Sequence, residues 1–374
     1  MKQDNSLQVF FALLRAGLWN KNVHISEFEP IRFNEVYCLG QEQSVVGLVA
    51  AGLEHVADVK VPKEVALQFV GDALQLEQRN IAMNHFIGSL VDKMGKVGIR
   101  TLLVKGQGIA QCYERPLWRS CGDVDLFLDE NNYIKARGYL ASIADCQAKE
   151  LEEEKHQEFT IGLWTVEIHG NMPSRLMPYV DEELSDIQRE AFEKNQTRIW
   201  KNGESDIALL SPDNDVIFVF THILKHFFRG GIGLRQVCDL ICLLWTYREV
   251  IDKNLLEARL RRMKLMSEWR AFGALAVDYL GMPYEAMPLY ASRAKWRRKA
   301  KRIVYLIIET GNFGHNRDMS YYSKYPFVIK KVISLWRHTW DSIRQLFIFP
   351  LDSTRVWRYM IAEGVRELHK DRQS

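Results

Sequence analysis

Apolar residues recur every three or four positions from residue 5 to about residue 98. Leu7, Phe10, Phe11 and Leu14 show this spacing near the start of the chain. One face of an amphipathic helix repeats at the same interval. The pattern therefore predicts an all-helical N-terminal region over residues 1–98.

Short apolar runs bounded by turn residues replace this pattern over residues 99–210. Such runs are typical of strands, and Asn202-Gly203 is a hairpin turn signal between two of them. Strands are predicted at 99–104, 124–128, 159–162, 164–169 and on both sides of the turn in 200–210, and helices at 108–113 and 130–144. These elements predict a small mixed-sheet α/β core.

Helical spacing returns after residue 210. Ser211 and Pro212 suit the N-cap and the first turn of a long helix, and Gly230-Gly231 separates it from the next one. We expect a C-terminal helical region over 211–374. The predicted fold class is α+β, with a small mixed-sheet core flanked by N- and C-terminal helical regions.

Composition narrows the class of protein. The 374 residues are 47% hydrophobic and 26% charged, which is typical of a globular chain and excludes a disordered or collagen-like one. Six cysteines without a CxxC pair fit a reducing cytoplasm better than a disulfide framework or a zinc ribbon. The most apolar stretch, 216–224, is too short to span a bilayer, so we expect a cytoplasmic protein without a membrane-spanning segment.

Two aspartates occupy alternate positions on the strand predicted near 124–128. Because side chains alternate along a strand, Asp123 and Asp125 share one face. Paired carboxylates repel each other unless a cation lies between them, and Mg²⁺ prefers carboxylate oxygens. Glu167, on a later predicted strand, is a third carboxylate. Three such groups could hold two Mg²⁺ ions, or Mn²⁺, for in-line nucleotidyl transfer.

A glycine-containing loop precedes the aspartates. Lys105-Gly106-Gln107-Gly108 closes a predicted strand and opens a helix. Glycine lets the backbone approach a phosphate, the helix N-terminus offers N–H donors, and Lys105 adds positive charge. Arg119, just before the aspartates, could complete a phosphate site. These five residues are the predicted nucleotide-binding group.

The order LLVKG, Arg119, GDVDLFL and VEIH resembles the polymerase-beta-like nucleotidyltransferase superfamily. It is most similar to a branch of uncharacterised bacterial nucleotidyltransferases, often seen beside surface-polysaccharide genes. The resemblance implies that Asp123 and Asp125 bind Mg²⁺, that Glu167 is the third carboxylate, and that Gly106 and its neighbours contact the triphosphate. Gln107 departs from the pattern, because the superfamily prefers glycine or serine there.

Further polar residues are weaker candidates. Lys225, Arg235 and Asp239 resemble a basic-then-acidic helical motif that faces the nucleotide in some toxin-related nucleotidyltransferases. The competing interpretation is an Arg235–Asp239 pair one helical turn apart. His169 shares a strand face with Glu167 and could order the active site or only cap it.

His222 and His226 are one helical turn apart and so share a helix face. A metal pair is conceivable there. Because no HExxH glutamate accompanies them and the helix is otherwise apolar, we favour packing or hydrogen bonding.

The C-terminal segment 291–374 is strongly basic, with 18 basic and 7 acidic side chains. Its basic residues alternate with aromatic ones, namely Trp296, Tyr305, Tyr321, Tyr322, Trp336 and Trp340. The segment could bind nucleic acid or anionic lipid, although a solvated amphipathic face is the simpler interpretation.

The sequence favours a Mg²⁺-dependent enzyme that moves a nucleoside monophosphate from a nucleoside triphosphate to an acceptor hydroxyl. The acceptor could be a sugar, RNA or a protein. A non-catalytic nucleotide-binding scaffold is the alternative from another class of function.

Overall fold

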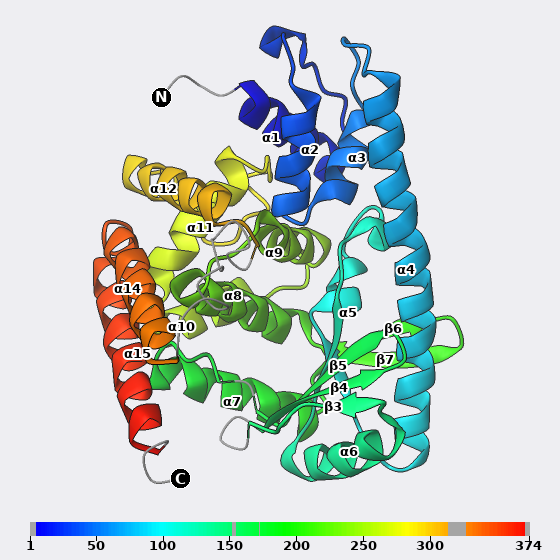
Figure 1. Cartoon of the computed structure of the whole chain (residues 1–374), viewed down its shortest axis with the longest axis vertical. Coiled ribbons are helices and arrows are strands. Elements are labelled where there is room, and N and C mark those ends of the chain that lie inside the picture. The colour runs from blue at the N-terminus through cyan, green and yellow to red at the C-terminus, as the bar shows by residue number, and fades with distance from the viewer. Residues whose placement is uncertain (1–4, 152–154, 172, 313–326, 371–374) are drawn as a thin grey trace.

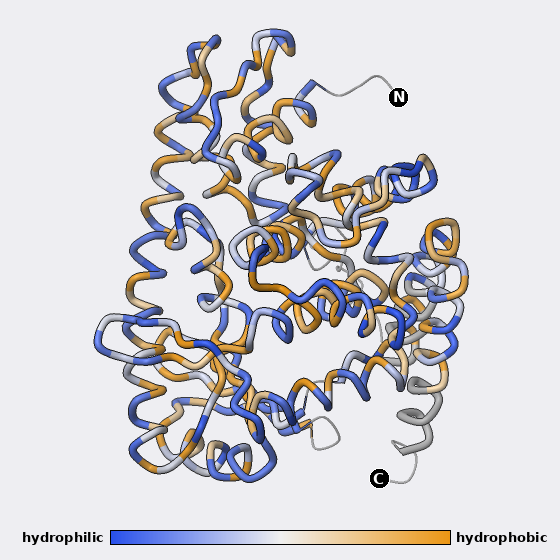
Figure 2. Tube along the Cα trace, turned by 180° about the vertical axis from the view of Figure 1, so that it is seen from behind, coloured by the Kyte–Doolittle hydropathy of each residue, from blue (hydrophilic) through white to orange (hydrophobic). Residues whose placement is uncertain are grey.

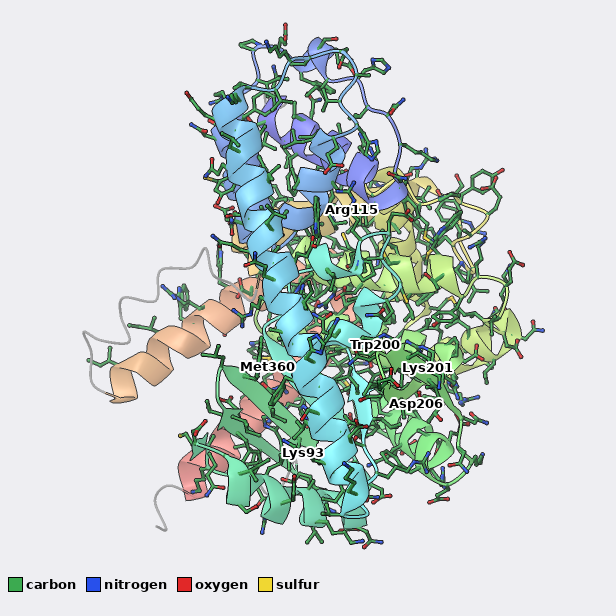
Figure 3. All side chains as sticks on the ribbon, turned by 90° about the vertical axis from the view of Figure 1, so that its right-hand side faces the viewer. Lys93, Arg115, Trp200, Lys201, Asp206 and Met360 are labelled. Carbon is green, nitrogen blue, oxygen red and sulfur yellow. The ribbon has the colours of Figure 1, made fainter. Side chains whose placement is uncertain are left out.

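A computed structural model describes residues 5–151, 155–171, 173–312 and 327–370 (Figure 1). The N-terminal region is helical, as predicted. Its elements are α1 (Asn5–Trp19), the short η1 (Ser26–Phe28), α2 (Phe33–Glu42), α3 (Val46–Leu53) and the long α4 (Lys63–Lys96). Figure 3 shows α4 running along one whole side of the molecule, past both the N-terminal helices and the sheet.

The middle of the chain forms the predicted mixed sheet. Its elements are β1 (Leu102–Val104), α5 (Gly106–Ala110), η2 (Pro116–Trp118), β2 (Asp123–Phe127), α6 (Glu130–Ile143), β3 (Cys146–Gln147), β4 (His156–Ile161), β5 (Trp164–His169), α7 (Pro178–Phe192), β6 (Thr197–Asn202) and β7 (Ser205–Leu210). Five strands lie in the order β1-β2-β5-β4-β3, and β6 and β7 pair separately as a hairpin. Only the β2–β5 pairing in the five-stranded sheet of the described residues is parallel.

The C-terminal region is helical in its described residues, as predicted. Its elements are α8 (Pro212–Arg229), α9 (Leu234–Thr246), α10 (Lys253–Arg262), α11 (Met266–Asp278), α12 (Ala294–Thr310), α14 (Phe327–Leu346) and α15 (Pro350–Lys370). Within the described chain, no helix is both long enough and apolar enough to cross a bilayer. Tyr321 and Tyr322 lie outside the described residues.

Several boundaries differ from the sequence prediction. The strand predicted at 159–162 begins three residues earlier, at His156, and α7 is an additional helix that was not predicted. Ser211 is the N-cap residue of α8, but its side chain makes no capping hydrogen bond. Pro212 at the first helical position and the acidic residues of the first turn therefore define this helix start.

The helical regions at the two ends of the chain share one hydrophobic core. The Trp19 indole donates to the Leu280 carbonyl at 2.6 Å, and the Phe11 ring packs edge-on against Tyr279 with centroids 5.7 Å apart. Figure 2 shows apolar segments concentrated through the middle of the molecule, where α8 and α9 lie. The N-terminal helices are thus joined to the helices after the sheet by a continuous interior.

A second core fixes the orientation of the sheet. The C-terminal half of α4 and one face of α6 pack against the sheet face that carries Val124, Leu126 and Val166. Because neighbouring side chains on a strand point to opposite faces, this packing directs the intervening aspartates of β2 to the other side of the sheet.

The α1–α3 contact depends on two glycines that let the helix backbones touch. A Cβ atom at Gly52 would lie 1.9 Å from the Leu13 carbonyl oxygen, and one at Gly17 would lie 1.9 Å from the Leu48 carbonyl oxygen. Neither backbone can move aside without separating the helices.

Gly52→Ala is therefore expected to lower the free energy of unfolding by about 1–3 kcal/mol, measured by urea denaturation. Gly71→Ala on α4 is the matched control, because a Cβ atom there has open space. The control should be stabilised by roughly 0.5–1 kcal/mol through helix propensity. Equal effects of the two substitutions would contradict the proposed close contact.

Candidate active site

The three predicted carboxylates come together on the free face of the sheet. Asp123 and Asp125 lie on β2, and Asp125 is in register with Glu167 on the parallel strand β5. Asp125 is 2% exposed, whereas Asp123 is half-buried at the strand entrance. Three acidic side chains therefore share one small region of the sheet, and they all line a cavity of about 430 Å³.

Lys105 neutralises part of this charge. Its Nζ lies 2.8 Å from Oδ1 of Asp125. The turn between β1 and α5 has an unusual backbone, because both Lys105 (φ 58°) and Gly106 (φ 42°) have positive φ. Such a conformation costs a non-glycine residue about 1–3 kcal/mol and is often found at functional sites. Here it holds the ammonium group against the carboxylates.

The proton affinities of the carboxyl groups differ because their neighbours differ. Repulsion by Asp125, followed by burial, raises the pKa of Asp123. Burial alone would raise the pKa of Asp125, but the Lys105 ammonium and a hydrogen bond with His169 outweigh it and lower that pKa. Hydrogen bonds from His156 and then His169 lower the pKa of Glu167. The site keeps more negative charge than Lys105 alone can neutralise.

Two histidines lie beside the carboxylates. Nε2 of His169 is 3.0 Å from Oδ1 of Asp125, and Nε2 of His156 is 3.3 Å from Oε2 of Glu167. The two imidazole rings are stacked, with centroids 4.6 Å apart and planes at 17°. His169 was predicted as a candidate that orders the active site, and its contact with Asp125 fits that role.

Helices α8 and α9 form the opposite wall of the cavity, and Lys225 and Arg235 make this wall basic. His222 and His226 also line it. Burial, followed by the charges of Arg175 and other cations, lowers the pKa of Lys225 to about 8. Burial, together with Lys225, lowers the pKa of His226 to about 4. His222 and His226 pack against each other with ring centroids 4.5 Å apart, consistent with the packing interpretation.

Arg119 lines the cavity and forms a buried ion pair with Asp239, and its contact with phosphate stays a prediction. Nε and Nη2 of Arg119 each lie 2.7 Å from an oxygen of Asp239, and the Tyr113 hydroxyl donates to the same carboxylate at 2.6 Å. Arg235 instead donates to the Ser120 carbonyl at 2.9 Å. Asp239 therefore pairs with Arg119, and not with the Arg235 side chain that the helical spacing suggested.

The predicted phosphate loop is only partly directed at the cavity. Lys105 and Gly106 line it. The Gln107 side chain is 1% exposed and donates to Asn80 of α4 at 2.8 Å, while a Cβ atom at Gly108 would meet Leu209. The Gln107 side chain and Gly108 thus hold α5 against its neighbours, and the contact of these residues with the nucleotide stays a prediction.

Sequence reasoning did not identify His156 or the loop after β5. The tight turn after Ile161 could have identified His156. It pairs Ile161 with Trp164, and continuing this antiparallel register along the two strands places His156 directly opposite His169. Arg175 gave no comparable signal. It lies in an irregular segment, and only the folded chain brings it to the cavity.

This sequence resembles nucleotidyltransferases in three features of the site. They are two aspartates on one strand, a glutamate on the parallel neighbouring strand and a glycine turn. The chain belongs to the family described as "Uncharacterised nucleotidyltransferase", whose model matches residues 29–281. This match confirms the resemblance to that family, and it includes the whole sheet and the helices α8 to α11.

The comparison with curated proteins finds no match. Among solved structures, the crystal structure of an antigenic nucleotidyltransferase-like protein from Paracoccidioides brasiliensis matches with a TM-score of 0.31 and 16% identity, covering 49% of this chain and 90% of that chain.

Proposed function

We propose that this protein is a Mg²⁺-dependent nucleotidyltransferase that moves a nucleoside monophosphate from a nucleoside triphosphate to an acceptor hydroxyl. The observation that carries the proposal is the convergence of Asp123, Asp125 and Glu167 on one wall of a cavity whose other wall is basic. A volume of about 430 Å³ is typical of small-ligand sites.

The carboxylates suit a divalent cation. Asp125 is 2% exposed and repels Asp123, so the pair keeps a charge that a bound cation would compensate. Asp123, Asp125 and Glu167 would hold the Mg²⁺ ions, since oxygen ligands suit this metal. When bound, the metal would supply positive charge to the triphosphate and lower the pKa of the acceptor hydroxyl.

The chain's own residues would align the reactants. Lys105 fixes the orientation of Asp125, and the Arg119–Asp239 pair holds the β2 entrance against α9. The basic wall, with Lys225 and Arg235, faces the carboxylates and suits the phosphates of the triphosphate. The rate enhancement would come mainly from alignment and charge compensation, as in phosphoryl transfer generally.

Lys225 gives the proposed triphosphate site a pH dependence. Its pKa of about 8 means that it is charged below that pH and loses its charge as the pH rises through it. The affinity for inorganic triphosphate, measured by titration calorimetry, should therefore fall between about pH 7 and pH 9.

Lys225→Met should bind inorganic triphosphate about tenfold more weakly at neutral pH and lose this pH dependence. Lys201→Met is the matched control, because Lys201 lies exposed on the β6–β7 hairpin and pairs with Asp206 (Figure 3). An unchanged pH profile in Lys225→Met would show that Lys225 does not bind phosphate.

The proposed activity is tested by label transfer. Purified protein, Mg²⁺ and each α-labelled nucleoside triphosphate in turn are incubated with separate RNA, protein and carbohydrate fractions of a bacterial lysate. We expect label in one fraction with the native protein and none with Asp125→Asn. Label in carbohydrate would support a role in surface-polysaccharide synthesis, and label in RNA or protein would support a toxin-like activity.

Absence of transfer to every fraction would count against the enzyme and favour a nucleotide-binding scaffold. That alternative predicts that a nucleoside triphosphate raises the melting temperature, since selective binding to the native state stabilises it.

The basic region from residue 291 lies outside the family match and would serve an anionic acceptor or partner.

A further inference from the structure

The cavity contains a second kind of ligand set beside the aspartates. A ring nitrogen of His156, a ring nitrogen of His169 and a carboxylate oxygen of Glu167 all lie within 4.8 Å of one another. The three residues come from the paired strands β4 and β5, where His156 is directly opposite His169. We infer that His156, Glu167 and His169 form a binding site for a divalent transition-metal ion.

The distances between the donor atoms suit such an ion. Oε2 of Glu167 is 3.3 Å from Nε2 of His156 and 3.5 Å from Nε2 of His169. Two ligands bound at about 2.1 Å lie about 3.0 Å apart at a right angle and about 3.4 Å apart at the tetrahedral angle. One ion could therefore contact Glu167 and either histidine at these distances, and binding of both imidazoles would require the stacked rings to rotate.

One ring nitrogen of His169 lies close to two carboxylates. Its Nε2 lies within reach of both Oδ1 of Asp125, at 3.0 Å, and Oε2 of Glu167, at 3.5 Å. A neutral imidazole has a single N–H group, so Nε2 can donate only one proton between these two carboxylates. A metal ion at this point could also contact Asp125, in competition with the Lys105 ammonium that lies 2.8 Å from the same oxygen.

The donor types determine which metal the site selects. Two imidazole nitrogens and one carboxylate favour Mn²⁺, Fe²⁺, Co²⁺ or Zn²⁺, whereas Mg²⁺ prefers oxygen ligands and retains water. Glu167 would then be shared between this ion and the Mg²⁺ proposed above, with Asp123 and Asp125 as the other oxygen ligands of Mg²⁺. The side chains of His156 and Glu167 are each 24% exposed, so an ion could reach them from the cavity.

This inference extends the proposed function, because it adds a nitrogen-containing metal site to the same cavity. It is nevertheless measurable without any transfer reaction. A protein that binds Mn²⁺ at these residues but transfers no nucleotide would support the metal site and contradict the enzyme. If the native protein transfers nucleotide and the histidine variant binds Mn²⁺ as tightly as the native protein, the enzyme is supported and the metal site is contradicted.

The probe is Mn²⁺ alone, titrated into the full-length protein and followed by loss of the free-ion electron paramagnetic resonance signal. His156→Gln keeps the size of the side chain but removes the imidazole, and it should weaken Mn²⁺ binding by at least about tenfold. The affinity for Mg²⁺ should fall much less, because the oxygen ligands remain. His85→Gln is the control, since His85 is exposed on α4 away from the cavity, and it should bind Mn²⁺ as the native protein does.

His169→Gln provides an independent second variant and should show the same selective loss. Melting curves without metal establish that each variant is folded before it is titrated. Native Mn²⁺ affinity in a folded His156→Gln or His169→Gln variant would overturn the inference and leave the two histidines as hydrogen-bond donors to the carboxylates.

Discussion

Asp123→Asn is expected to reduce nucleotidyl transfer by about 10³-fold or more while making the metal-free protein more stable. The loss of transfer follows because one of three metal-binding carboxylates is removed. The gain in stability follows because Asp125 repels Asp123 and raises its pKa, so the charged form is disfavoured in the folded state.

The sign of this effect can be checked by urea denaturation at two pH values. A carboxyl group whose pKa is raised on folding destabilises the native state above that pKa, and protonation at lower pH relieves the effect. The stabilisation of Asp123→Asn should therefore be larger at neutral pH than at acidic pH. Asp206→Asn is the matched control, since Asp206 is exposed and pairs with Lys201 on the hairpin (Figure 3).

The control should transfer nucleotide as the native protein does. Full activity in Asp123→Asn would exclude Asp123 from the reaction. A variant that loses both activity and stability would instead indicate a structural role for this carboxylate.

Arg119→Met is expected to lower the free energy of unfolding by about 3–5 kcal/mol. The substitution leaves the carboxylate of Asp239 buried without its cation, although the Tyr113 hydroxyl still donates a hydrogen bond to it. Both charged side chains are less than 10% exposed, so water cannot replace the lost guanidinium. The measurement is urea denaturation at neutral pH.

Arg115→Met is the control for this prediction. Arg115 pairs with Glu54 through two hydrogen bonds, but both side chains are more than one-third exposed (Figure 3). Its loss should cost less than about 1 kcal/mol. The double substitution Arg119→Met with Asp239→Leu should recover part of the stability. Equal losses from Arg119→Met and Arg115→Met would show that the Asp239 charge is already compensated by other groups.

The sheet and the carboxylates could be predicted because their signals are local. Alternation on β2 places Val124 and Leu126 on one face and the two aspartates on the other without knowledge of the rest of the fold. The Asn202-Gly203 turn and Pro212 are equally local, and the structure has a hairpin and a helix start at these positions.

The opposite wall of the cavity could not be predicted in the same way. The spacing of Arg235 and Asp239 is compatible with a pair along one helix, yet Asp239 bonds to Arg119, which is 120 residues away. Gln107 is part of a glycine-rich loop, but the position of α4 turns its side chain toward Asn80. Which partner each of these side chains contacts depends on how distant elements pack together. The local sequence of one helix or loop does not determine that packing.

The shared core of the first and later helices also bears on how the chain folds as it is synthesised. Leu280 and Tyr279, which complete the surroundings of Trp19 and Phe11, leave the ribosome on the order of tens of seconds after α1. During that interval the strongly apolar face of α1 lacks its final cover. The nascent chain is thus expected to need chaperone protection during synthesis, and its N-terminal helices should reach native packing only after α11 has been made.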